Sequence, residues 1–235
     1  MSIADNVARI KERICQAAQR AGRSPDSILL MAVSKTVEGE RMRQAYNAGI
    51  RAFGENRVQE FSEKAVALRD LPGVELHLIG HLQTNKTKAA VELFHSLDSV
   101  DSLRLAQKVN QAAQQNGKRF PVLIEINVGG ESNKNGLTAD SPELEELLQE
   151  IPRLEHLQLR GLMAVPPYSE DPQGARPYFC TLRDLHRSIA ARKLPGIGMD
   201  VLSMGMSHDF EVAVEEGSTC VRVGSAIFGA RPNPQ

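Results

Sequence analysis

The chain has 235 residues, and its 28 lysines and arginines nearly balance 29 aspartates and glutamates, for a formal net charge of −1 at pH 7. This balance excludes a global electrostatic attraction to nucleic acid or to anionic membranes, so we expect neither as a partner. A chain of this length can bury a large core, and all-parallel barrels of this size commonly form one domain. We therefore expect a single domain over residues 1–235.

The cysteines and the N-terminal segment bear on the cellular compartment. Cys15, Cys180 and Cys220 show neither a C-x-x-C spacing nor a histidine at a spacing typical of metal ligands, so we expect reduced packing thiols and no metal site. The N-terminal segment lacks the apolar stretch of a signal peptide, and no apolar run reaches the length of about 18 residues that a membrane helix needs. These absences predict a cytoplasmic protein.

The first predicted element is an amphipathic helix over residues 3–21. Apolar side chains recur there at helical spacing, at Ile3, Val7, Ile10, Ile14 and Ala18. Gly22 follows and is typical of a helix end.

Eight short apolar runs then alternate with polar stretches of helical periodicity. The predicted strands are residues 28–33, 51–53, 75–79, 96–100, 121–128, 157–163, 199–203 and 220–223. The predicted helices between and after them are residues 37–48, 57–71, 85–93, 102–116, 141–150, 171–192 and 209–216. Strands separated by helices favour parallel pairing through right-handed crossovers, and eight such units close a (β/α)8 TIM barrel. A doubly wound open sheet is the alternative.

Lys35 is the first candidate functional residue, because it directly follows the first predicted strand. An ammonium at the end of a buried strand is partly desolvated, which favours the neutral amine that can attack an aldehyde. The alternative is a solvated lysine at a strand end.

Two segments rich in small residues follow the last two predicted strands, at residues 203–207 and 224–229. Their backbone N–H groups can approach an anion closely, and the loops after strands seven and eight of such barrels frequently bind phosphate. The alternative is that both are simply tight turns. The loops at residues 129–136 and 166–174 also follow strands, so we expect both at the same mouth of the barrel.

Arg222 lies between Val221 and Val223 in the eighth predicted strand. Because side chains alternate along a barrel strand, we expect its guanidinium to point into the barrel. An internal ion pair with Glu125 is the structural alternative to a ligand contact.

Six sequence blocks, in matching order along nearly the whole chain, resemble a known family. They are AVSKT at 32–36, FGEN at 53–56, HLIGHLQTNK at 77–86, RGLMA at 160–164, SMGMS at 203–207 and VRVGSAIFG at 221–229. In these blocks the chain resembles the pyridoxal phosphate-binding proteins of the YggS/PROSC type, also called pyridoxal phosphate homeostasis proteins. The resemblance implies a fold type III barrel similar to the N-terminal domain of alanine racemase, without the second domain of that enzyme.

The resemblance also implies site residues. Lys35 matches the lysine that holds pyridoxal 5′-phosphate (PLP) as a covalent aldimine, and Asn56 matches a polar residue near the cofactor ring. Arg222 matches an arginine that faces the pyridine nitrogen, although a contact with the phosphate stays open. The segments that match the phosphate cradle contain Ser203, Gly205, Met206, Ser207, Gly224 and Ser225.

The function that the resemblance implies is PLP homeostasis, in which the protein carries, buffers or delivers the cofactor to apo-enzymes without turnover. An amino-acid racemase that uses Lys35 as a base is the alternative, and a partner-binding regulator is a third. Two-base racemisation needs a second acid or base, for which Tyr168 is the candidate, although this tyrosine can simply pack on its proline-rich loop. We expect a monomer, because the racemase builds its dimeric active site with the second domain.

Three histidines and a lysine carry weaker expectations. His77 and His81 have no metal-ligand set around them, so we expect a structural or cofactor-adjacent role. His208 lies beside residues 203–207 and can either attract phosphate or cap a surface turn. Lys134 lies in a loop that is a candidate lid or partner contact.

Overall fold

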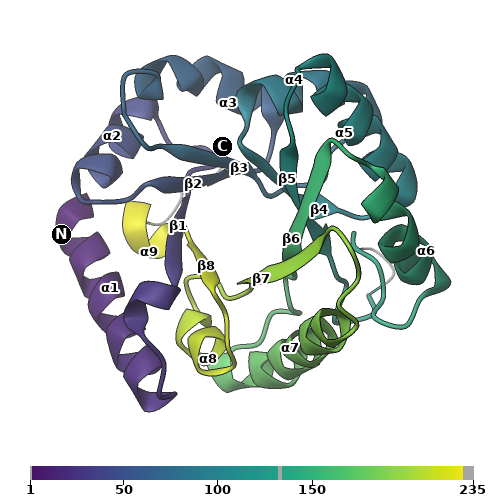
Figure 1. Cartoon of the computed structure of the whole chain (residues 1–235). Helices are drawn as coiled ribbons and strands as arrows, with labels where there is room; N and C mark the ends of the chain where they lie inside the picture. Colours follow the sequence, from purple (N-terminus) through teal and green to yellow (C-terminus); the bar gives the residue numbers. More distant parts are fainter. Residues whose placement is uncertain (1, 132–133, 230–235) are drawn as a thin grey trace.

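The computed structural model describes residues 2–131 and 134–229, and it contains a closed barrel of eight parallel strands (Figure 1). Each strand pairs with its neighbour in the sequence, and β1 pairs with β8 to close the ring. The predicted (β/α)8 barrel is therefore confirmed. The doubly wound open sheet is excluded, because an open sheet has two unpaired edges.

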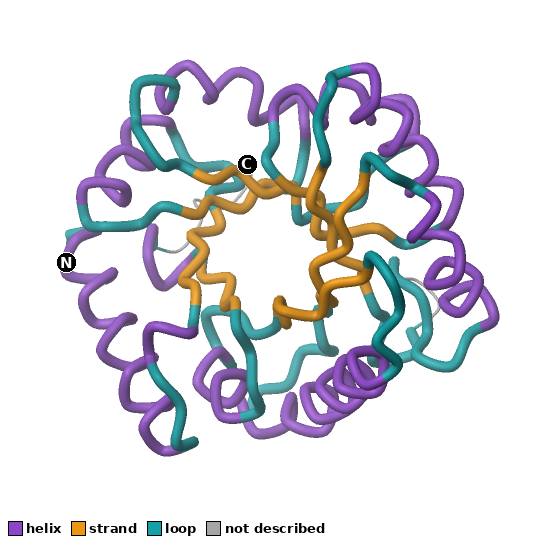
Figure 2. The backbone as a smooth tube through the Cα atoms, viewed as in Figure 1, coloured by secondary structure: helices purple, strands orange, loops and turns teal. Residues whose placement is uncertain are grey.

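The strands form an inner ring that helices surround, as Figure 2 shows. The strands β2, β4 and β8 are buried at every position, as is typical of parallel strands covered by helices. Their bounds are β1 Leu29–Val33, β2 Ala52–Glu55, β3 Glu75–Leu78, β4 Ser96–Val100, β5 Phe120–Glu125, β6 Leu157–Met163, β7 Ile197–Ser203 and β8 Cys220–Val223.

The helices follow the strands around the ring. They are α1 Ile3–Arg20, α2 Gly39–Asn47, α3 Val58–Lys64, α4 Thr87–Leu93, α5 Leu103–Gln115, α6 Pro142–Glu150, α7 Arg176–Ala191, α8 Phe210–Glu215 and α9 Ser225–Phe228. Short 3-10 turns lie at Pro25–Ser27, Ala65–Leu68, Thr84–Lys86, Ile151–Arg153 and Pro172–Ala175. Within the described residues, none of the helices is both long and apolar enough to cross a membrane.

The predicted N-terminal helix is present as α1 and packs on the outside of the barrel against α2, α8 and α9 (Figure 1). Ser2 caps it, because the Ser2 hydroxyl accepts from the backbone N–H of Asp5 at 3.1 Å. The apolar positions that predicted the helix are buried against the barrel. α1 therefore packs on the helices that flank β8 and β1, the two strands that close the ring.

Two predicted elements end three or more residues before their predicted ends. The helix expected over residues 57–71 ends at Lys64 and continues as a 3-10 turn, in which the carbonyl of Ala67 accepts from the Arg43 guanidinium at 2.7 Å. The strand expected over residues 121–128 ends at Glu125, because the backbone of Leu137 returns to hydrogen bond with Glu125 and Asn127. Residues 132 and 133 of the predicted mouth loop lie outside the described residues.

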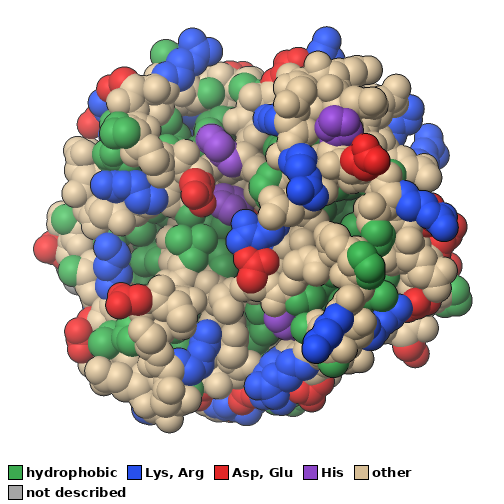
Figure 3. All heavy atoms as spheres, viewed as in Figure 1, with side chains coloured by type: hydrophobic (Ala, Val, Ile, Leu, Met, Phe, Trp, Pro, Cys, Tyr) green, Lys and Arg blue, Asp and Glu red, His purple; other side chains and the backbone are tan. Residues whose placement is uncertain are grey.

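The face of the molecule in Figure 3 carries basic and acidic side chains mixed over its whole extent. No single sign of charge gathers on this face, which agrees with the net charge of −1. Inside the ring, a second apolar cluster contains Met31, Ala52 and Cys220. This cluster fills the barrel below the strand ends, as in other barrels of this type.

Candidate functional site

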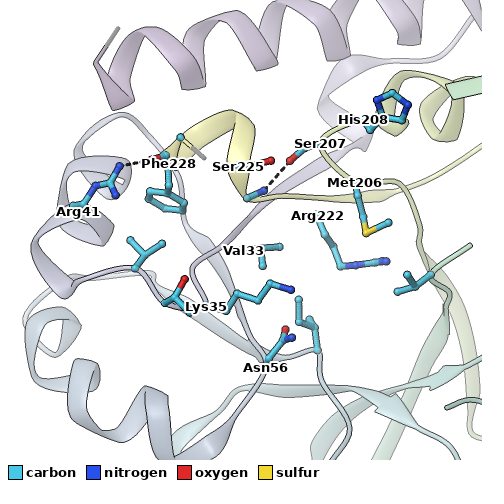
Figure 4. A pocket seen from close by; sticks show the side chains of 16 residues that line it. Val33, Lys35, Arg41, Asn56, Met206, Ser207, His208, Arg222, Ser225 and Phe228 are labelled. Carbon is cyan, nitrogen blue, oxygen red and sulfur yellow. Dashed lines mark hydrogen bonds between the residues drawn. The ribbon is translucent and has the colours of Figure 1, made fainter. Parts of the chain in front are cut away.

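A cavity of about 460 Å³ opens at the carboxyl ends of the strands (Figure 4). Its walls come from the ends of β1, β2, β3, β6, β7 and β8 and from the residues that follow them. Seven of the nine predicted site residues line it: Lys35, Asn56, Met206, Ser207, Arg222, Gly224 and Ser225. The other two, Ser203 and Gly205, lie behind the cavity wall and contact Arg222.

Lys35 is partly buried and extends from the end of β1 into the cavity (Figure 4). The residue before it, Ser34, is fully buried and continues the strand ladder, because its N–H donates to the carbonyl of Gly54 at 3.0 Å. The residue after it, Thr36, has a φ of 64° and donates its N–H to the Glu60 carboxylate. Lys35 is therefore held between a strand residue and a fixed turn.

Backbone donors converge on the hydroxyl of Ser207 at one wall of the cavity. The N–H of Gly224 lies 3.2 Å from Ser207 Oγ, and the N–H of Ala226 lies 3.5 Å from the same atom (Figure 4). A Cβ atom at position 224 would lie 3.2 Å from the carbonyl oxygen of Val33, so glycine fits this wall best. Amide donors and hydroxyls gathered at one wall can hold an anion.

The turn between β7 and α8 has a conformation that needs glycine at position 205. Gly205 has a φ of +94°, and a Cβ atom there would lie 2.5 Å from the Cβ of Ala213. Asp209 holds the same turn, because its Oδ1 accepts from the Met206 N–H at 2.6 Å. Burial raises the pKa of the Asp209 carboxyl, and the hydrogen bond from Met206 opposes this shift.

Arg222 lies inside the barrel, and only 3% of it is exposed. Its guanidinium donates to Ser203 Oγ at 2.7 Å and to the carbonyl of Ala164 at 2.8 Å. Burial lowers the pKa of Arg222, and nearby acidic groups, among them Glu125, oppose this shift. Within the described residues, the hydrogen bonds of this guanidinium go to Ser203 and Ala164 and not to Glu125. A guanidinium has five N–H donors, so further donors remain to face the cavity.

The two histidines near β3 are paired with aspartates and do not line the cavity. His77 Nδ1 lies 3.1 Å from Asp98, and His81 Nδ1 lies 3.0 Å from Asp101. Burial alone would lower the pKa of His77, but Asp98 and Glu75 outweigh it and raise the pKa to about 9.

Tyr168 lies beside a second cavity of about 240 Å³ and does not line the main one. Its side chain is 82% exposed, and its ring centroid lies 5.9 Å from that of His208. His208 lines both cavities, and its Nε2 lies 3.0 Å from the carbonyl oxygen of Glu170. Lys134 lines the second cavity and pairs with Glu131.

Several residues of the cavity wall were not predicted as site residues from the sequence, among them Arg41 and Phe228. The Arg41 guanidinium donates to the carbonyl of Phe228 and lies 5.9 Å from the centroid of its ring. Phe228 belongs to one of the six blocks but had no assigned role. Arg41 lies on a polar helix, where no local pattern distinguishes it from its neighbours.

The described residues include no group of three or more His, Cys, Asp or Glu side chains arranged to hold a metal ion. Glu125, the last residue of β5, does not line the cavity. Burial and the neighbouring Asp101 raise the pKa of its carboxyl to about 7.

Comparison with known proteins gives closely similar relatives. The family model described as the N-terminal domain of alanine racemase matches residues 5–232. A pyridoxal phosphate homeostasis protein of Aquifex aeolicus is 45% identical over 98% of this chain and 99% of its own length. The protein of that name from Escherichia coli is 42% identical over 97% of each chain.

Solved structures agree with this result. The structure of PipY from Synechococcus elongatus with PLP bound has a TM-score of 0.84 and 34% identity, over 97% of this chain and 100% of that one. An alanine racemase of Clostridium difficile has a TM-score of 0.72 at 16% identity, over 97% of this chain and 58% of that one. The racemase likeness concerns the fold alone.

Proposed function

We propose that this chain, which belongs to the family of pyridoxal phosphate homeostasis proteins, binds PLP in the cavity at the barrel mouth and carries, buffers or delivers it. The observation that carries the proposal is the convergence of Lys35, Arg222 and the Ser207–Gly224 wall on one cavity of about 460 Å³. A primary amine, anion donors and a buried cation are the groups that an aldehyde-bearing phosphate ester needs. The PLP-bound structure of PipY supports the same ligand.

Lys35 is the residue proposed to hold the cofactor covalently. PLP, when bound, supplies an aldehyde carbon that a primary amine attacks reversibly. Lys35 lines the cavity and is partly buried, so its primary amine lies where an aldehyde bound in the cavity can reach it. The backbone on both sides of Lys35 is fixed, by Gly54 on one side and by Glu60 on the other.

The phosphate is assigned to the wall formed by Ser207, Gly224 and Ser225. The N–H groups of Gly224 and Ala226 already converge on one oxygen, Ser207 Oγ, which marks a position where several donors can meet an anion. Met206 and the buried turn behind it complete this wall, with Ser203 and Gly205 in support. No carboxylate side chain lies among the residues that line the cavity in the described part of the chain.

Asn56 and Arg222 are assigned to the cofactor ring. A guanidinium is a permanent donor, so Arg222 can hydrogen bond to a ring nitrogen only when that nitrogen carries no proton. An unprotonated ring is a poor electron sink, which disfavours turnover of amino acids. The position of Arg222, fixed by Ser203 and Ala164, supports this role.

The racemase alternative, with Lys35 as one base, has little support. It needs a second acid or base beside the same cavity, and Tyr168 lines the neighbouring cavity with 82% of its surface exposed. We therefore propose that the protein acts without turnover, as a monomer, and passes PLP to apo-enzymes.

The deciding experiment pairs two assays on the purified holo-protein. We expect reactivation of a PLP-dependent apo-enzyme, and we expect no deuterium wash-in at the α-carbon of alanine. Wash-in at enzymatic rates that depends on both Lys35 and Tyr168 would replace this proposal by the racemase. Light scattering checks the monomer in the same sample.

A further inference from the structure

A buried charged cluster lies behind the segment that carries Lys35. The carboxylate of Glu55, at the end of β2, is fully buried, and the side chain of Lys64, at the end of α3, is 13% exposed. Their closest atoms, Lys64 Nζ and Glu55 Oε1, lie 3.2 Å apart. Glu60, one helical turn before Lys64, is the third member of the cluster, and its Oε1 lies 3.0 Å from Lys64 Nζ.

The cluster binds the residue that precedes Lys35. The Lys64 ammonium donates to the backbone carbonyl of Ser34 at 3.0 Å. The Ser34 hydroxyl donates to Glu55 Oε1 at 2.7 Å. Ser34 is therefore fixed through both its main chain and its side chain.

The same cluster binds the residue that follows Lys35. Glu60 Oε1 accepts from the N–H of Thr36 and also from the Lys64 ammonium. Thr36 has a φ of 64°, a left-handed conformation that a β-branched residue rarely adopts. The hydrogen bond to Glu60 compensates this unfavourable conformation, and Lys64 holds Glu60 in place.

The pKa values of the two carboxyls in the cluster are shifted in opposite directions. Burial raises the pKa of Glu55 despite the opposing hydrogen bonds from Ser34 and Lys64. Burial would also raise the pKa of Glu60, but the bonds from Thr36 and Lys64 lower it overall. An ammonium has three N–H donors, and Lys64 directs them at the oxygens of three residues.

We infer that Lys64 is a positioning residue for Lys35, an inference that rests on the proposed binding of PLP. Through Ser34 on one side and Glu60 with Thr36 on the other, Lys64 sets the backbone from which the Lys35 side chain enters the cavity. Lys64 does not line the cavity. We therefore expect Lys64 to affect the position of the Lys35 amine in the cavity and to leave the phosphate wall unchanged.

Titration of the full chain with two ligands separates an effect on Lys35 from an effect on the phosphate wall. PLP has an aldehyde and needs Lys35 for its covalent bond. Pyridoxine 5′-phosphate lacks the aldehyde and depends on the phosphate wall and on the contacts of Asn56 and Arg222 with the ring. We expect Lys64→Met to weaken PLP binding on the order of tenfold, because small misplacement of a reacting group is costly. Binding of pyridoxine 5′-phosphate should stay unchanged, and Lys64→Arg should regain part of the loss.

The matched control is Lys108→Met, which removes the same charge from an exposed position on α5. Equal PLP affinities for Lys64→Met and Lys108→Met would overturn the inference, as would a parallel loss of both ligands by a folded Lys64→Met. Glu60→Leu gives a second route if Lys64→Met does not fold, since it removes the acceptor of Thr36 and should show the same selective loss.

Wild type and Lys35→Ala are titrated beside these variants. A wild type that binds neither ligand would overturn both the proposed function and the role of Lys64. A wild type that binds PLP through Lys35, beside an unaffected Lys64→Met, would overturn the role of Lys64 alone.

Discussion

The guanidinium of Arg222 donates a hydrogen bond of 2.7 Å to the hydroxyl of Ser203, so the last two strands of the barrel are joined by side chains directly behind the cavity. Both residues are buried, with 3% of Arg222 and none of Ser203 exposed. A hydrogen bond from a buried charged donor contributes more than one at the surface, because water cannot replace the lost partner.

Ser203→Ala should therefore destabilise the fold. We expect a loss of about 1–3 kcal/mol in the free energy of unfolding. Among the described residues, the guanidinium would keep only the Ala164 carbonyl as a hydrogen-bond acceptor. Urea unfolding measures this difference. Ser188→Ala, at an exposed position on α7, is the control and should have little effect. Equal stability of the two variants would mean that the Arg222–Ser203 bond contributes nothing.

Lys35→Ala should abolish the covalent attachment of PLP. Wild-type protein incubated with PLP should be yellow and should retain the cofactor after borohydride reduction, because only an amine forms the reducible bond. Mass spectrometry of the reduced protein checks the site of attachment. Lys88→Ala, on the exposed side of α4, should behave as wild type. A reduced adduct of the same stoichiometry on Lys35→Ala would assign the anchor to another lysine.

Ser207→Glu should weaken PLP binding much more than pyridoxal binding. The new carboxylate would lie where the N–H groups of Gly224 and Ala226 converge, so it would compete with a phosphate dianion and repel it. Ser225→Glu should act in the same direction. We expect a loss on the order of 100-fold for PLP, equivalent to about 2.7 kcal/mol.

Ser188→Glu adds the same charge at an exposed position on α7 that does not line the cavity, and it serves as the control for both variants. Pyridoxal has no phosphate, so its affinity separates loss of the anion site from general damage. Equal losses for PLP and pyridoxal would show that this wall does not hold the phosphate.

The sequence predicted those site residues whose location follows from their position in or directly after a strand. Lys35 follows a strand, Arg222 alternates with two valines in β8, and the small residues follow β7 and β8, so parallel strand order alone brings them to one mouth. Lys64 and Arg41 could not be predicted in this way. Both lie on helices among other polar residues, and their roles depend on tertiary contacts with Ser34 and Phe228.

The pH dependence of stability should report the carboxyl of Glu125, whose pKa burial and Asp101 raise from 4.5 to about 7, against the opposing effects of Arg222 and His81. The folded pKa exceeds the unfolded value, so the folded state binds more protons in this interval. The contribution of Glu125 to stability is therefore fully present below pH 4.5 and is lost as the pH rises through about 7.

Glu125→Gln keeps the size of the side chain and removes its titration. Between pH 4.5 and 7 the wild type should lose on the order of 2 kcal/mol more stability than this variant, measured by urea unfolding across the range. His77→Gln is the control, because the pKa of His77 is raised from 6.5 to about 9 and its stabilising effect is lost only in that higher interval. A Glu125→Gln variant with the wild-type slope below pH 7 would contradict the burial of an ionisable carboxyl at this position.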